Sequence, residues 1–226
     1  MFSFSPVYRL LPVYALFCST AAFADTIVST LGAGNTYNGT IGGPTISGAD
    51  TEYDATAQFF TSSGNFAVTQ IDIALVSLDG TNSAAVSLWT DSAGQPGAQL
   101  GSWVASPFPA SSSLSSATTS LSGGQMITGI TGVQLLSGQS YFLEAAPGAP
   151  DTDLFWYQQT AAPGSGVYST GSPSGPWVSE AGSPDGAYAV FGNTVSAPEP
   201  ASILLALAGL AAIGFLRRRR SDPLQL

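Results

Sequence analysis

The stretch FAVTQIDIALVSL, residues Phe66–Leu78, decides the fold class of this chain. Ile71, Ile73 and Leu75 recur at every second position, and the residues between them fall on the opposite face. A period of two is that of a β-strand, because successive side chains of a strand point to opposite faces of its sheet. The stretch therefore predicts a strand and not a helix.

Other runs repeat this pattern along the chain, and turn residues separate them. Asp-Gly, Gly-Gln-Pro-Gly and Pro-Asp-Gly stand between runs, and all three are typical turn sequences. Strands with a turn about every ten residues predict an all-β domain of the β-sandwich or jelly-roll kind over residues 25–196. The further predicted strands are Ala84–Asp91, Gly138–Ala146, Asp153–Gln159 and Gly186–Val195.

Two stretches lack the strand pattern. Residues Ser29–Asp54 are rich in Gly and Thr, and Ser106–Gly124 is rich in Ser and Thr. The first predicts loop or short irregular strand, and the second predicts a solvated connection between strands.

Charge is distributed very unevenly. The 226 residues include five arginines and no lysine or histidine, and no basic residue lies between Asp25 and Ala197. Of the 14 acidic residues only Glu199 and Asp222 lie outside that stretch, which leaves twelve within it. Nucleic acid is excluded as a partner, because phosphate contacts need cationic side chains. The field of this stretch attracts cations such as Ca²⁺.

Residues 1–24 predict a signal peptide, to be read by the Sec machinery and signal peptidase. Arg9 precedes the apolar run Leu10–Phe17, and Ala22 and Ala24 form a small-x-small cleavage site that would leave Asp25 first. The alternative is a lipoprotein signal acylated at Cys18, which the bulky residue before that cysteine disfavours.

The C-terminal region predicts a membrane-spanning helix. The uncharged run Ala201–Leu216 is ~24 Å long as a helix, slightly shorter than a bilayer core of ~30 Å. Arg217, Arg218, Arg219 and Arg220 follow it, and by the positive-inside rule they place residues 221–226 in the cytoplasm. The alternative, a buried helix of a soluble core, does not suit a block of four arginines.

The order of parts at residues 197–220 resembles the PEP-CTERM protein-sorting signal. Pro198, Glu199 and Pro200 supply the motif that names this signal, the helix over 201–216 follows, and the arginine cluster ends it. The resemblance implies processing by an exosortase, a membrane cysteine protease of Gram-negative bacteria that make exopolysaccharide. It also implies a transient stay in the inner membrane and then the cell surface or extracellular matrix.

Residues 25–196 are here called the exported stretch. Segments of it resemble the choice-of-anchor family of bacterial surface domains, type R. The resemblance rests on Val86–Trp103, Gly132–Ala145, Ala57–Thr61 and the downstream aromatic triplet FWY. It implies a β-sandwich outside the cell and transfers no functional residue.

An enzyme is not expected, because the exported stretch lacks His, Cys, Lys and Arg. A carboxylate glycosidase is the remaining catalytic alternative, and it needs two acidic groups across a cleft. Its candidates are Glu144, Asp151, Asp153 and Glu180.

Two binding sites are predicted more weakly, and no resident cofactor is expected. Carboxylates at alternate positions suit a structural Ca²⁺, although solvated acidic loops explain them equally simply. Exposed aromatic residues stack on sugar rings, although most tryptophans of a sandwich belong to its core. The calcium candidates are Asp50, Glu52, Asp54, Asp151 and Asp153, and the glycan candidates are Trp103, Trp156 and Trp177, with Tyr157 and Tyr168.

These observations predict an exported cell-surface or extracellular-matrix protein with a structural or adhesive role in exopolysaccharide. The alternative is a glycan-binding module that uses exposed Trp and Tyr, and a carboxylate glycosidase ranks third.

Overall fold

The computed structural model describes residues 24–39, 42–111, 119–120, 125–158, 167–180, 182–183 and 185–195. These residues form strands and loops without an α-helix, so the all-β prediction is confirmed. None of the described residues forms a helix long and apolar enough to cross a membrane, and the predicted helix over 201–216 lies outside them. The strands are β1 Asp25–Ser29, β2 Thr36–Tyr37, β3 Gly42–Ser47, β4 Ala55–Thr61, β5 Phe66–Ile73, β6 Leu75–Asp79, β7 Ala84–Ser92, β8 Gln95–Ala105, β9 Thr119–Ser120, β10 Met126–Thr128, β11 Gln134–Leu135, β12 Ser140–Pro147, β13 Asp153–Tyr157, β14 Val167–Thr170, β15 Val178–Ser179 and β16 Tyr188–Thr194.

One layer of the domain consists of two sheets joined end to end. In the first sheet β1, β16 and β5 lie side by side, and both β10 and β11 pair with β5; in the second the order is β3-β13-β6. The sheets meet at Ala74, where β5 passes into β6. There the Ala74 N–H donates to Ala187 O (2.9 Å), and Ala74 O accepts from the Tyr157 N–H (2.9 Å). A single long strand thus crosses both sheets.

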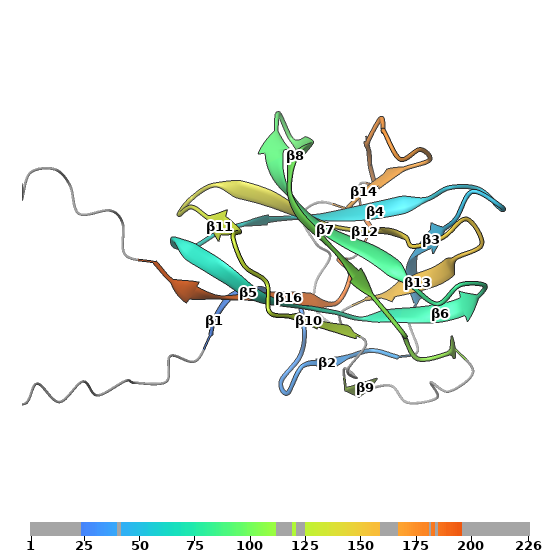
Figure 1. The fold of residues 1–226 in the computed structure, drawn as a ribbon, viewed down its shortest axis with the longest axis horizontal. Coiled ribbons are helices and arrows are strands. Elements are labelled where there is room, and N and C mark those ends of the chain that lie inside the picture. Colours follow the sequence, from blue (N-terminus) through green and yellow to red (C-terminus); the bar gives the residue numbers. More distant parts are fainter. Residues whose placement is uncertain are drawn as a thin grey trace, which may run out of the picture.

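The other layer is one sheet in the order β15-β14-β4-β12-β7-β8, with antiparallel pairing throughout. Figure 1 shows it above the first layer, with β5, β16 and β6 below. The sheets do not close on one another, an arrangement that fits the expected sandwich.

Apolar side chains from both layers fill the space between them. Phe60, Leu88 and Leu143 come from the six-stranded sheet, and Ile71 and Ile73 from the layer opposite; all are buried in one cluster. Burying a side chain of this size contributes about 1.5–3 kcal/mol, so this cluster is the main source of stability. A smaller cluster on the outer face of the first layer joins Ala74 and Val76 to aromatic residues, Tyr37 and Tyr157. Residues 71–76 are therefore buried on both faces, and the alternation in sequence shows only one of them.

The predicted strands are present, and one expected turn is shorter than the sequence indicates. The stretch Ser29–Asp54, expected to be loop or short irregular strand, contains loops and the short strands β2 and β3, and β3 pairs with β13 with a shift in register. The β7–β8 turn lies at Ala93 and Gly94, which have φ of 55° and 83°, and the rest of the expected turn sequence, Gln95, Pro96 and Gly97, belongs to β8. The segment Gly132–Ala145 contains β11, a turn and β12, and these two strands pair with other strands, β11 with β5 and β12 with β4 and β7.

Candidate functional site

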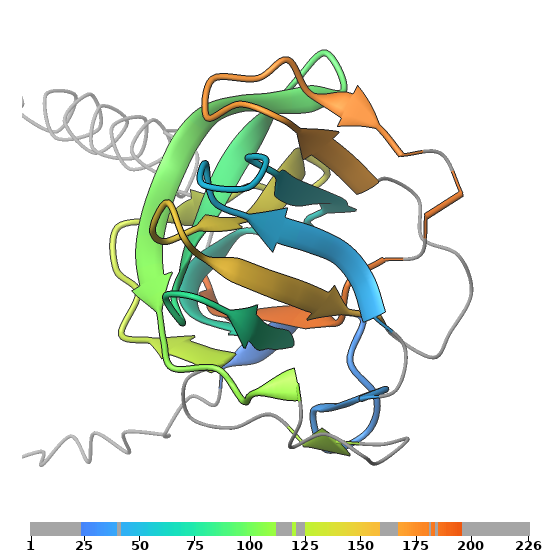
Figure 2. The ribbon, with the colours of Figure 1, turned by 90° about the vertical axis from the view of Figure 1, so that its right-hand side faces the viewer.

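The candidate site is a polar groove that opens where the two layers part, between β3 and the β14–β15 pair. Figure 2 faces this side of the domain, with β3 in blue and β14 and β15 in brown and orange. Two adjoining hollows of about 680 and 370 Å³ share Thr45, Asp54 and Ser169. The groove is lined by Gly43, Pro44, Thr45, Ser47, Thr51, Glu52, Tyr53, Asp54, Gln158, Ser169, Gly171, Glu180 and Ser183.

The groove exists because the chain changes layers between β3 and β4. Strand β3 pairs with β13 along one edge only, and its other edge faces the groove. At its end Ser47 and Asp54 exchange backbone hydrogen bonds of 3.1 and 2.9 Å. The loop between them crosses to the second layer, where β4 begins. This crossing places Glu52, Tyr53 and Asp54 at the groove wall.

Neutral hydroxyl groups hold the carboxylates of the groove. Thr45 Oγ1 donates to Asp54 Oδ2 (3.3 Å), and Ser169 Oγ donates to Glu180 Oε1 (2.7 Å). The first pair comes from β3 and the start of β4, and the second from β14 and the residue that follows β15. Two carboxylates that lie 126 positions apart in sequence thus line one hollow.

The surroundings of Asp54 and Tyr53 in the groove favour the protonated forms of these two residues. Burial raises the pKa of Asp54 to about 6; the Thr45 hydrogen bond opposes this rise, and the charges of Glu180 and Glu52 add to it. Burial also raises the pKa of Tyr53 to about 12, with contributions from Glu144 and Asp54. The groove therefore combines ionisable carboxylates, hydroxyl donors and a neutral phenol, and the exported stretch brings no cation to it.

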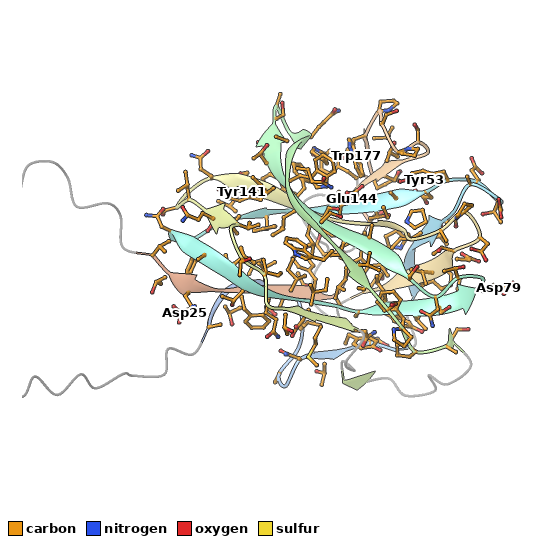
Figure 3. The ribbon with its side chains drawn as sticks, viewed as in Figure 1. Asp25, Tyr53, Asp79, Tyr141, Glu144 and Trp177 are labelled. Carbon is orange, nitrogen blue, oxygen red and sulfur yellow. The ribbon has the colours of Figure 1, made fainter. Side chains whose placement is uncertain are left out.

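The acidic candidates for calcium and for catalysis are only partly brought together. Glu52, Asp54 and Glu180 line the groove, whereas Glu144 is buried outside its lining and accepts a hydrogen bond from Trp89. Figure 3 shows Glu144 within the domain, and its charge contributes to the raised pKa of Tyr53. Within the part of the chain that the structure describes, no group of three or more His, Cys, Asp or Glu side chains is placed to hold a metal ion. The remaining candidates, Asp50, Asp151 and Asp153, lie outside the lining of the groove.

The aromatic candidates for glycan stacking belong mainly to the core, which corrects part of the prediction. Trp156 is fully buried and donates from Nε1 to Ala187 O (3.2 Å), so it is not accessible to a sugar ring. Trp103 is partly buried against the main core, and Trp177 is also only partly exposed. Tyr157 is buried, and Tyr168 packs edge-on against Phe142. Tyr53, absent from the prediction, is the aromatic residue that lines the groove.

A family comparison concerns the segment that directly follows the last described residue, Val195. The model of the PEP-CTERM protein-sorting motif matches residues 196–220. The chain carries a PEP-CTERM motif. Neither a curated protein nor a solved structure matches the chain.

The PEP-CTERM motif implies an exported protein that an exosortase sorts at the membrane. The predicted sorting residues Pro198, Glu199 and Pro200 and the cluster Arg217–Arg220 lie within the matched segment and outside the described residues. Ala22 of the predicted cleavage site also lies outside them, whereas Ala24 is exposed immediately before β1.

Proposed function

We propose that this protein is a non-catalytic component of the cell surface or extracellular matrix, and that it adheres to neutral exopolysaccharide through the polar groove. The PEP-CTERM motif supports export and sorting. A place outside the cell also agrees with the resemblance of the exported stretch to choice-of-anchor surface domains.

One observation carries the proposal, namely the lining of the groove by carboxylates and hydroxyls beside an aromatic ring. Sugar hydroxyls donate charge-assisted hydrogen bonds to carboxylates such as Asp54 and Glu180, which are roughly twice as strong as neutral ones. Tyr53 offers an aromatic surface with a polar end. Anionic polysaccharides would be repelled, because no cation of the exported stretch balances its acidic residues.

Binding to a neutral exopolysaccharide, measured by affinity electrophoresis of the released protein, tests the proposal. The double variant Asp54→Asn/Glu180→Gln should weaken binding at least tenfold, because it removes two of the three carboxylates that line the groove, Glu52 being the third. Asp79→Asn is the matched control, since Asp79 is an exposed carboxylate outside the groove lining. Equal binding by the double variant and the wild type would refute the role of the groove.

A carboxylate glycosidase is the second candidate, and the pairing of Asp54 with Glu180 in one hollow favours it. A carboxyl group with a pKa of about 6 suits a general acid, and a second carboxylate suits a base or nucleophile. Release of reducing sugar from the same polysaccharide separates the two candidates. The adhesive proposal expects no release, whereas the enzyme requires release that Asp54→Asn abolishes.

A further inference from the structure

The domain has two ends that differ in charge. The first described strand begins and the last described strand ends at the same end of the domain, at Asp25 and before Val195. This terminal end consists of residues 24–25, 62–65, 136–139 and 193–195. Asp25 of β1 pairs with Gly192 of β16, and the Val195 N–H donates to Asn65 O (2.9 Å). Figure 1 shows β1 and the end of β16 on the same side of the domain.

The terminal end is nearly free of charge. Its loops are tied by the Ser62 N–H, which donates to Gln139 O (3.0 Å), and by the Ser137 N–H, which donates to Asn65 Oδ1 (2.9 Å). Asp25 is its one acidic residue, and Leu136 is 55% exposed there. A surface with a single carboxylate is repelled by anionic lipid headgroups far less than one that gathers many carboxylates.

The second end gathers half of the acidic residues of the exported stretch. This acidic end consists of the loops 48–54, 79–83 and 148–153, which hydrogen bonds connect to one another. The Asp50 N–H donates to Pro150 O (2.8 Å), and Thr152 Oγ1 donates to Thr81 O (2.9 Å). Six of the twelve carboxylates lie there: Asp50, Glu52, Asp54, Asp79, Asp151 and Asp153. Figure 3 shows Asp25 and Asp79 at opposite sides of the domain.

The segment between Val195 and Ala201, here called the tether, is too short to span the distance between the two ends of the domain. The continuous path β5–β6 runs from Phe66 at the terminal end to Asp79 at the acidic end, which is about 40 Å at 3.3 Å per residue. Five residues lie between Val195 and Ala201, where the predicted membrane segment begins, and the six Cα–Cα steps across them span at most about 20 Å. The polar headgroup layer takes up about 6 Å of this length.

We propose that the terminal end is a membrane-facing surface, which lies on the bilayer in the anchored precursor and directs the acidic end and the polar groove outward. The partner is the headgroup layer of the bilayer into which residues 201–216 insert, so the proposal rests on that predicted insertion and not on glycan binding. A short tether holds the terminal end near the lipid, and anionic headgroups repel the acidic end. The groove is then open to the matrix before the protein is released.

Single cysteines test the orientation in the full-length precursor, trapped by removal of the exosortase. Ser137→Cys reports the terminal end and Thr81→Cys the acidic end; both positions are exposed, and Cys18→Ser removes the natural thiol. Labelling with a maleimide-polyethylene glycol of about 5 kDa should be at least fivefold slower at position 137 than at position 81. The difference should vanish in the processed, released protein, and also in a precursor with twelve Gly/Ser residues inserted after Val195.

Two outcomes would overturn the proposal, and they differ in what else they reject. Equal labelling rates in a precursor that sediments with membranes reject the orientation alone. A precursor that does not sediment with membranes rejects the insertion of residues 201–216 together with the orientation. Neither outcome affects the binding of glycan by the groove, which affinity electrophoresis measures separately.

Discussion

Trp89 Nε1 donates a 2.6 Å hydrogen bond to Glu144 Oε2, so an indole stands where a cation would be expected beside a buried carboxylate. Glu144 is only 7% exposed. Asp72 is fully buried and is held in the same way, by the amides of Gln70 (2.7 Å) and Asn35 (2.9 Å). The exported stretch has no basic residue, so its buried carboxylates depend on neutral N–H donors.

The change Trp89→Phe should lower the free energy of unfolding by about 1.5–3 kcal/mol at neutral pH, because it removes a hydrogen bond to a buried charged group. Urea denaturation measures the effect. In a Glu144→Gln background the same change should cost less, since the bond that it removes is then neutral. An equal cost in both backgrounds would show that Trp89 acts through packing alone.

The domain should be more stable in mildly acidic than in neutral solution. Burial raises the pKa of Asp54 to about 6, and it also raises the pKa values of Asp72, Glu144 and Asp185. A carboxyl group with a raised pKa binds its proton more tightly in the folded state. Its contribution to stability is complete below the unfolded pKa near 4 and is lost as pH rises through the folded pKa.

Urea denaturation at a series of pH values measures this dependence. The free energy of unfolding should fall between pH 4 and about pH 7, and Asp54→Asn should flatten the part between pH 4 and 6. A wild-type stability that rises over this interval would contradict the expected sign.

The strands could be predicted from the sequence where large apolar residues recur at every second position, as at Ile71 and Ile73. Strand β3, with the sequence GGPTIS, could be predicted only as loop or short irregular strand, because two glycines and a proline favour turns. Its partner β13 lies more than 100 residues away, and the hydrogen bonds between the two strands override the local preference. Likewise, the sequence of β11 does not show that it pairs with β5 rather than with its neighbour β12.

The groove could be predicted only in fragments. The sequence marks Asp54 as one of a run of carboxylates and Glu180 as a separate acidic residue, and only the fold brings them together. It also does not show which face an aromatic residue takes. Trp156 turns inward because Gly186 leaves room for it: a Cβ at position 186 would lie 2.4 Å from the indole Nε1. Exposed and buried tryptophans thus look alike until the packing is known.

Gly80 in the acidic end and Gly94 in the β7–β8 turn provide a matched pair of substitutions. Gly80 and Gly94 both have positive φ, 67° and 83°, so alanine is strained at either position by about 1–2 kcal/mol. A Cβ at Gly80 would lie 1.7 Å from Asp151 O, whereas nothing lies within 4 Å of one at Gly94. Gly94→Ala should therefore lower the free energy of unfolding only by the conformational strain. Gly80→Ala should lower it further, because the loops 79–83 and 148–153 must separate.

Urea denaturation of the two variants measures the difference, which we expect to exceed about 1 kcal/mol in the free energy of unfolding, by analogy with the cost of overpacking. Hydrogen exchange locates the change. Gly80→Ala should speed exchange of the Gly148 and Asp50 amides, whose acceptors are Ser83 O and Pro150 O, and Gly94→Ala should leave both unchanged. Equal destabilisation by the two substitutions would mean that the close approach of Gly80 to Asp151 does not hold the acidic end together.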